Sequence, residues 1–139
     1  MKIVLVTGGA GEIGSAICRK FAEAGYSVIA TYNSNKEKAE KLLTELNLIS
    51  EPSIGDGQLS YNNPQHAIFH APTTDAAKVA DLREFVEGKY RKLDVLVNNA
   101  GITTPVKHDD LDELTDEWID KIMQTNFRGG FAMVRAFKD

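Results

Sequence analysis

The stretch Ile3-Val4-Leu5-Val6-Thr7-Gly8-Gly9-Ala10-Gly11-Glu12-Ile13-Gly14 decides the fold of this chain. Its first four residues are apolar, as expected of a strand that is buried on both faces of a parallel sheet. The glycines allow a sharp turn, and the residues after them have helical spacing. In this order, strand, glycines and helix form a site whose backbone N–H groups and helix dipole bind a pyrophosphate. We predict a dinucleotide site here, formed by Gly8, Gly11, Glu12, Ile13 and Gly14.

Length and composition describe one globular domain over residues 1–139. The chain has 42% hydrophobic and 26% charged residues and a formal net charge of −4, which does not favour nucleic acid as a partner. No apolar run is long enough to cross a membrane or has the layout of a signal peptide. The single cysteine, Cys18, cannot form an internal disulfide, and its apolar neighbours indicate a buried side chain rather than a nucleophile. We expect a cytoplasmic protein without membrane contact.

Short β-branched runs alternate with longer segments of helical spacing, which predicts βαβ units and a parallel sheet. The fold class is α/β: a three-layer, Rossmann-like, doubly wound sheet of about four strands in the order 3-2-1-4. The expected strands are Ile3–Val6, Val28–Thr31, Ala67–Phe69 and Val95–Val97. The expected helices are Glu12–Ala24, Lys36–Leu46, Asp75–Tyr90 and Asp116–Phe137. Ligands should bind at the carboxyl ends of the first and fourth strands, where the strand order reverses.

The polar segment Leu48–Gln65 is long for a connection between a helix and a strand. It could be a lid or partner-binding loop beside the cofactor, or an insertion that the surface tolerates. The second interpretation is favoured, because surface loops accept extra length at little cost.

The fourth expected strand ends in two amides, a small residue and a glycine: Asn98, Asn99, Ala100 and Gly101. Asparagines at this edge can hydrogen-bond neighbouring strand ends or a ribose, and the two small residues let a cofactor approach the backbone. On spacing alone, a structural turn is an equally good explanation.

In the last expected helix, Thr115 suits the N-cap, and an apolar stripe follows at helical spacing. Asn126 lies on that stripe, which comprises Trp118, Ile122, Gly129, Met133 and Phe137. A buried amide needs hydrogen-bond partners, so Asn126 could bond neighbouring backbone or hold a water near an active site. The residues alone favour hydrogen bonds from Asn126 to neighbouring backbone over the binding of a water.

At these three places the chain resembles the short-chain dehydrogenase/reductase family, and the resemblance covers essentially the whole chain. It implies that Gly8 and Gly14 belong to a pyrophosphate loop and that the segment 98–101 stabilises the sheet and flanks the adenosine ribose. It also implies that Asn126 holds a water in a proton relay. The implied reaction is hydride transfer between NAD(P)(H) and a small carbonyl or alcohol substrate.

The chain departs from the family's pattern at two positions. Its glycines fit the spacing of the family's extended, epimerase-like branch, and Glu12 stands where the compact branch has a glycine. A carboxylate so close to a phosphate site would weaken binding, so we expect Glu12 to point to solvent. Pro72 occupies the place of an aspartate that often contacts adenine, while Asp75 is expected to begin a helix.

The family's chemistry depends on a Tyr-x-x-x-Lys pair with an upstream serine, where the lysine lowers the tyrosine's pKa. Since residue 139 falls in the helix before that segment, we expect no catalytic pair and a chain that binds cofactor at most. The alternatives are a non-catalytic nucleotide-binding regulatory or partner module and a fragment of a sugar-nucleotide epimerase, and the segment 98–101 argues against the latter. An apolar edge at the fourth strand predicts a homo-oligomer.

The end of the second strand governs the choice of cofactor. An acid there would hold the 2′-hydroxyl of NAD, and no acid occurs between Ala30 and Lys36. This favours NADP over NAD, with Asn33, Ser34 and Lys36 as candidate partners of the 2′-phosphate. The three histidines lack metal-ligand spacing, so no metal is expected.

Overall fold

The computed structural model describes residues 1–49 and 64–139 and places four parallel strands in one sheet. In the order β3-β2-β1-β4, the strands are Ala67–His70, Ser27–Tyr32, Ile3–Val6 and Val95–Val97. All three pairings are parallel, with Val4 beside Val28 on one side and Val95 on the other. The predicted α/β class and strand order are confirmed.

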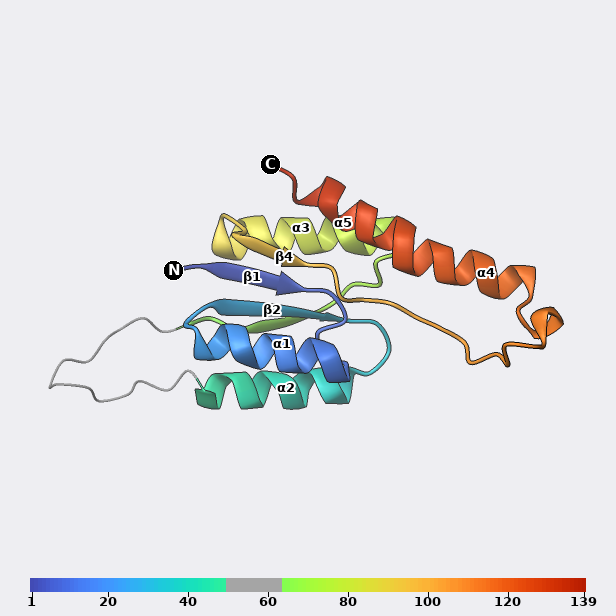
Figure 1. The fold of residues 1–139 in the computed structure, drawn as a ribbon. Helices are drawn as coiled ribbons and strands as arrows, with labels where there is room; N and C mark the ends of the chain where they lie inside the picture. The colour runs from blue at the N-terminus through green and yellow to red at the C-terminus, as the bar shows by residue number, and fades with distance from the viewer. Residues whose placement is uncertain (50–63) are drawn as a thin grey trace, which may run out of the picture.

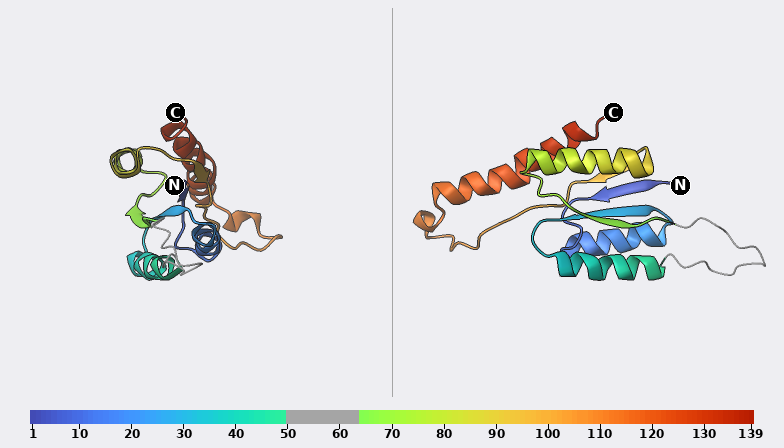
Figure 2. Two further views of the ribbon diagram at one scale, coloured as in Figure 1. Left: turned by 90° about the vertical axis from the view of Figure 1, so that its left-hand side faces the viewer. Right: turned by 180° about the vertical axis from the view of Figure 1, so that it is seen from behind.

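Helices cover both faces of the sheet. They are α1 (Glu12–Glu23), α2 (Lys36–Ile49), α3 (Ala76–Tyr90), α4 (Asp116–Met123) and α5 (Gly130–Ala136). Figure 1 shows α1 and α2 side by side on one face and α3 and α5 on the other, and the views of Figure 2 show the same three layers. None of the helices in the described ranges is long and apolar enough to span a membrane.

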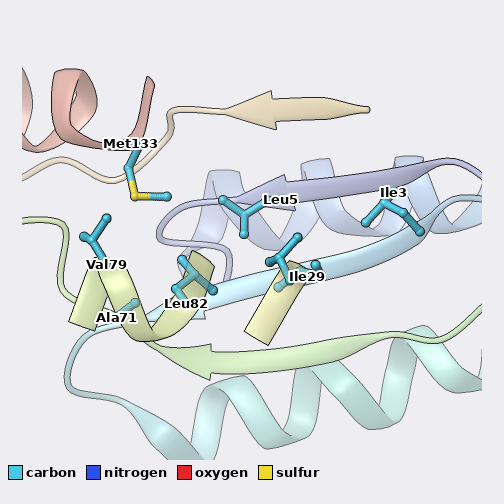
Figure 3. Packing of buried hydrophobic residues seen from close by; sticks show 8 residues of the cluster. Ile3, Leu5, Ile29, Ala71, Val79, Leu82 and Met133 are labelled. Atoms are coloured by element: carbon cyan, nitrogen blue, oxygen red, sulfur yellow. The ribbon is translucent and has the colours of Figure 1, made fainter. Parts of the chain in front are cut away.

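The alternation of side chains along β1 produces two separate cores. Ile3 and Leu5 pack with residues of α3 and α5, whereas Val4 and Val6 pack with residues of α1 and α2. Figure 3 shows the first core, where Met133 of α5 approaches from above the sheet and Val79 and Leu82 come from α3. Because both faces are covered, β1 has to be apolar at every position.

The helix expected over residues 116–137 is interrupted. Thr115 caps α4 as predicted, its hydroxyl accepting the Trp118 N–H at 3.4 Å, but residues Gln124–Gly129 form a π-helical segment between α4 and α5. Such segments occur mostly within longer helices and often at functional sites. Figures 1 and 2 show α4 projecting beyond the carboxyl ends of the strands.

Two other boundaries bear on the site. Asp75 begins α3 as expected, with Oδ1 accepting the Lys78 N–H at 3.1 Å. Helix α2 continues to Ile49, so the first two residues of the segment 48–65 are helical rather than part of a loop. The two interpretations of that segment concern residues 50–63, which lie outside the described residues.

Candidate functional site

A cleft of about 760 Å³ lies at the carboxyl end of the sheet, where the strand order reverses. Its lining comes from the glycine loop after β1, the end of β2, the turn after β3 and the segment after β4. The predicted residues that line it are Gly8, Gly11, Glu12, Ile13, Gly14, Asn33, Ser34, Asn99, Ala100 and Gly101. The fold therefore brings together residues that are more than ninety positions apart in the sequence.

Gly8 and Gly14 have no room for a side chain, and neither does Gly9, where an added Cβ would lie 2.7 Å from Ala30 Cβ. Gly8 has a φ of +62°, and a Cβ added to it would lie 3.0 Å from Ala100 Cα. At Gly14, a Cβ would collide with the Gly8 carbonyl oxygen and come within 2.8 Å of Asn99 Nδ2. Gly8 and Gly14 are needed for the tight packing of α1 against the loop and the end of β4.

Asn99 and Thr7 lock the glycine loop to the end of β4. The Asn99 amide Nδ2 donates to the carbonyl oxygens of Thr7 at 3.0 Å and Gly8 at 3.1 Å. In return, the Thr7 hydroxyl accepts the backbone N–H groups of Asn99 and Ala100, both at 3.0 Å. The sequence predicts Asn99 as a site residue but not Thr7. Thr7 is buried, and its residue type does not mark it as part of a binding site. These four hydrogen bonds hold the glycine loop against the end of β4.

The mouth of the glycine loop is open. Gly11 is exposed and forms the N-cap of α1 with a φ of −73°, and a Cβ there would make only ordinary contact, 3.4 Å from the Gly8 carbonyl oxygen. Glu12 is exposed at the start of α1, in agreement with its expected contact with solvent, yet it also borders the cleft. Ile13 is 72% exposed and adds apolar surface at the same mouth.

The end of β2 supplies the polar side of the cleft. Asn33 and Ser34 line it as predicted, but Lys36 does not. The Lys36 ammonium instead lies 3.6 Å from the Glu40 carboxylate on the surface of α2. Lys38, the third residue of α2, lines the cleft in its place.

Asn98 lies outside the cleft. Its exposed side chain donates from Nδ2 to the Gly130 carbonyl oxygen at 3.3 Å, which ties the end of β4 to the start of α5. Of the four residues expected to flank a ribose, the structure thus brings Asn99, Ala100 and Gly101 to the cleft and uses Asn98 for packing.

Asn126 bonds neighbouring backbone, the first of the two roles that its residue type allowed. Oδ1 accepts the Ile102 N–H at 2.8 Å, and Nδ2 donates to the Ile102 carbonyl oxygen at 2.9 Å. The expectation that the side chain is buried is wrong, because Asn126 is exposed within the π-helical segment. Both ends of its amide are engaged, so the side chain anchors the segment after β4 at the rim of the cleft.

Cys18 lies beneath the glycine loop and is fully buried, as expected. Its Sγ lies 3.8 Å from the Gly9 carbonyl oxygen, and burial raises the pKa of the thiol to about 12 despite the nearby charge of Arg19. A thiol with this pKa is not a nucleophile at neutral pH. Among the described residues, no group of three His, Cys, Asp or Glu side chains is placed to hold a metal ion.

The spacing Tyr-x-x-x-Lys occurs once in the chain, at Tyr32 and Lys36, although no catalytic pair was expected. Tyr32 ends β2, its ring 5.4 Å from that of His70, and Lys36 begins α2 outside the cleft. The two residues belong to different elements, with Lys36 occupied by Glu40, so the spacing alone does not make them an acid–base pair.

Residues 2–139 match the short chain dehydrogenase family. A short-chain type dehydrogenase/reductase from Picea abies is 34% identical over 96% of this chain and 46% of its own length. A 3-oxoacyl-(acyl-carrier-protein) reductase from Staphylococcus aureus is 32% identical over 96% of this chain and 48% of its own. An alcohol dehydrogenase from the archaeon Thermococcus sibiricus, complexed with 5-hydroxy-NADP, superimposes with a TM-score of 0.81 at 26% identity, over 100% of this chain and 52% of that one.

The chain belongs to the short-chain dehydrogenase/reductase family, whose members are oxidoreductases that use NAD(P). It spans about half the length of the curated relatives that it matches.

Proposed function

We propose that this chain is the cofactor-binding part of an NAD(P)(H)-dependent oxidoreductase that transfers hydride between the nicotinamide and a small carbonyl or alcohol substrate. The observation that carries the proposal is the preformed glycine loop, with Gly8 and Gly14 packed against the end of β4 and fixed by Thr7 and Asn99. A backbone approach that no Cβ obstructs is what a pyrophosphate requires.

The cleft is large enough for a dinucleotide and has the polarity that such a ligand requires. Asn33 and Ser34 would face the adenosine ribose, and Asn99, Ala100 and Gly101 would flank it from the other side. With no acid among the residues that line the end of β2, the cleft favours NADP over NAD. The cofactor supplies the hydride, and the residues of this chain bind and orient it.

Asn126 contributes to catalysis by positioning. Its two hydrogen bonds to Ile102 hold the segment after β4 against the π-helical segment. In this proposal the nicotinamide end of the bound cofactor would lie close to that contact. The water-binding role that the family resemblance implies would then fall to the backbone of the π-helical segment, since the amide is already used.

A titration combined with an activity assay tests the proposal. The purified chain should bind NADPH and NADH in calorimetry and should show little turnover with a panel of ketones, aldehydes and alcohols. A longer product of the same gene that adds a serine and a Tyr-x-x-x-Lys segment should turn over.

The two readouts separate this function from that of a non-catalytic nucleotide-binding module. Cofactor binding without turnover in any longer product would favour the module. Ordinary dehydrogenase rates from the 139-residue chain would refute the proposal that this chain only binds the cofactor. Failure to bind either dinucleotide would refute both the oxidoreductase and the nucleotide-binding module.

We also propose a cytoplasmic homo-oligomer. The buried free thiol of Cys18 suits a reducing compartment. An exposed apolar stripe follows α4 and α5, formed by Ile119, Met123, Phe127, Phe131 and Val134. Large exposed patches of this kind mark association surfaces.

A further inference from the structure

The π-helical segment Gln124–Gly129 packs against the turn after β3 at its last residue. Gly129 is buried, and a Cβ added to it would collide with the Thr73 hydroxyl oxygen and lie 3.0 Å from Thr73 Cβ. Thr73 is 8% exposed and belongs to a turn that lines the cleft. Two segments that are distant in the sequence therefore meet with no room for a methyl group between them.

The backbone of Gly129 does not itself require glycine. Its φ of −62° and ψ of −43° are those of an ordinary α-helix, in which alanine is the more favourable residue. Gly130 has the same φ and ψ, and a Cβ added there would lie 3.9 Å from the Asn98 side chain. Because the two glycines differ only in their surroundings, the contact with Thr73 is what restricts residue 129 to glycine.

The turn that carries Thr73 is tied down on both sides. Before it, Ala71 is buried in the first core (Figure 3), and its N–H donates to the Tyr32 carbonyl oxygen at 3.1 Å. After it, the Asp75 N–H donates to the Pro72 carbonyl oxygen at 3.0 Å, which closes the turn. Thr73 therefore presents a fixed surface against which the helix packs.

The same π-helical segment holds the rim of the cleft. Asn126 forms two hydrogen bonds with the backbone of Ile102, at 2.8 and 2.9 Å, and Ile102 lines the cleft. A π-helical turn, with its i→i+5 hydrogen bonds, is wider than an α-helical turn, so a return to regular α-helix would change the direction of the Asn126 side chain. A contact that fixes Gly129 therefore also fixes the position of Ile102.

We propose that Thr73 is a positioning residue of the cofactor site. By packing against Gly129 it holds the π-helical segment, and through Asn126 it fixes Ile102 at the end of the cleft that receives the nicotinamide. The inference rests on the proposed function, because that function assigns this end of the cleft to the nicotinamide. Thr73 acts there through the helix, since its own turn follows β3, at the opposite edge of the sheet from β4.

The test moves the bulk of the contact from one residue to the other. Gly129→Ala adds a Cβ that collides with the Thr73 hydroxyl, and Thr73→Ala removes that hydroxyl. The double variant combines the two changes and leaves two Cβ atoms 3.0 Å apart, which a small shift accommodates. Gly130→Ala is the matched control, because it adds the same methyl group to the next residue, where there is room for it.

Two measurements are made on each protein. Hydrogen exchange at the Ile102 N–H, whose acceptor is Asn126 Oδ1, reports the contact at the rim without any ligand. Calorimetric titration compares NADPH with 2′-phospho-ADP-ribose, which lacks only the nicotinamide. Circular dichroism reports whether each variant is folded.

We expect the Ile102 N–H to exchange at least about tenfold faster in Gly129→Ala than in wild type, and faster also in Thr73→Ala, where nothing stops the helix. The affinity of Gly129→Ala for NADPH should fall by about fivefold or more, while its affinity for 2′-phospho-ADP-ribose stays within about twofold of wild type. The double variant should return to within about twofold of wild type in both measurements, because the two changes compensate. Gly130→Ala should match wild type throughout.

Wild-type exchange at Ile102 in Gly129→Ala, an equal effect in Gly130→Ala, or no recovery in the double variant would overturn the inference. An equal loss of affinity for both ligands in Gly129→Ala would also overturn it, because the damage would then not be confined to the nicotinamide end. If Gly129→Ala does not fold, a folded double variant with normal Ile102 exchange supports the inference, and an unfolded one overturns it. A wild type that binds neither ligand would refute the proposed function, while exchange at Ile102 still decides whether Thr73 holds the π-helical segment.

Discussion

Glu12 occupies the first position of α1, where two electrostatic effects oppose each other. Its negative charge favours the helix, because the unpaired N–H groups there carry the positive end of the helix dipole. The same charge borders the cleft and disfavours a bound pyrophosphate. An exposed carboxylate acts through water, so both effects are small.

Replacement of Glu12 by Gln should therefore tighten the binding of NADPH and NADH alike. The expected gain is about two- to fivefold, since screened surface charges are worth about 0.3–1 kcal/mol. Calorimetric titration at low and high salt measures it, and the gain should shrink as salt rises. Weaker binding by Glu12→Gln would mean that the carboxylate contacts the cofactor favourably, for instance through a ribose hydroxyl.

At the scale of single residues, the sequence is informative where backbone geometry restricts which residue type fits a position. It is misleading where a residue's role depends on the helix face that it occupies. Gly8 and Gly14 could be predicted because no side chain fits at either position. The sequence predicts Lys36 at the cofactor site, but Lys38 lines the cleft, because distance along the sequence does not show which helix face a residue occupies. Thr7 carried no signal, since a buried threonine that bonds backbone is common in any strand end.

The junction of β2 and β3 depends on the protonation state of a histidine. His66 Nδ1 accepts the Val28 N–H at 3.1 Å, so this nitrogen must be unprotonated. Burial lowers the pKa of His66 from its ordinary value of 6.5. Because the unfolded chain takes up a proton more readily than the folded one, the contribution of His66 to stability is lost as pH falls below 6.5.

We expect the free energy of unfolding of the wild type to fall between pH 7.5 and pH 5.5, as measured by urea denaturation. His66→Gln keeps an acceptor for the Val28 N–H without a titrating ring, so its unfolding free energy should change less over this range. His108→Gln, which alters an exposed histidine, should behave like the wild type. The same pH dependence in His66→Gln as in wild type would show that other groups are responsible.

Among the elements, strand order and three of the helices followed from the hydrophobic pattern, whereas the π-helical segment did not. The apolar stripe predicted from the sequence, from Trp118 to Phe137, has helical spacing on both sides of residues 124–129. This spacing alone gives no sign of the wider π-helical turn. Tertiary contacts accompany the break in the regular helix. The Asn126 side chain forms two hydrogen bonds with the backbone of Ile102. Gly129 lies so close to Thr73 that a Cβ added to Gly129 would collide with the Thr73 hydroxyl.

At the scale of the whole molecule, the segment from α4 to α5 carries five exposed large hydrophobic side chains. Phe127 is 68% exposed and Phe131 is 59% exposed, and both lie in the stripe from Ile119 to Val134. Burying two such rings against a partner would contribute about 1.5–3 kcal/mol each.

We predict that the chain self-associates at micromolar concentration and that Phe127→Glu with Phe131→Glu shifts it toward monomer, as measured by sedimentation velocity. Leu111→Glu alters a residue that is more exposed, at 80%, but lies outside the stripe, and it should leave the association unchanged. A wild type that sediments as a stable monomer would contradict this prediction.

The central claim is that the cleft beside the glycine loop holds a dinucleotide. Gly11 offers a direct steric test, because its φ of −73° suits any residue and an added Cβ would make only ordinary contact with the Gly8 carbonyl oxygen. Gly88, exposed in α3 with nothing within 4 Å of an added Cβ, allows the same substitution far from the cleft.

The deciding measurement is a calorimetric titration of NADPH into wild type, Gly11→Leu and Gly88→Leu. The account predicts saturable binding to wild type and Gly88→Leu and a loss of at least about tenfold in Gly11→Leu, whose leucine would occupy the pyrophosphate position. Equal NADPH affinity in Gly11→Leu and wild type, with both folded, would contradict it.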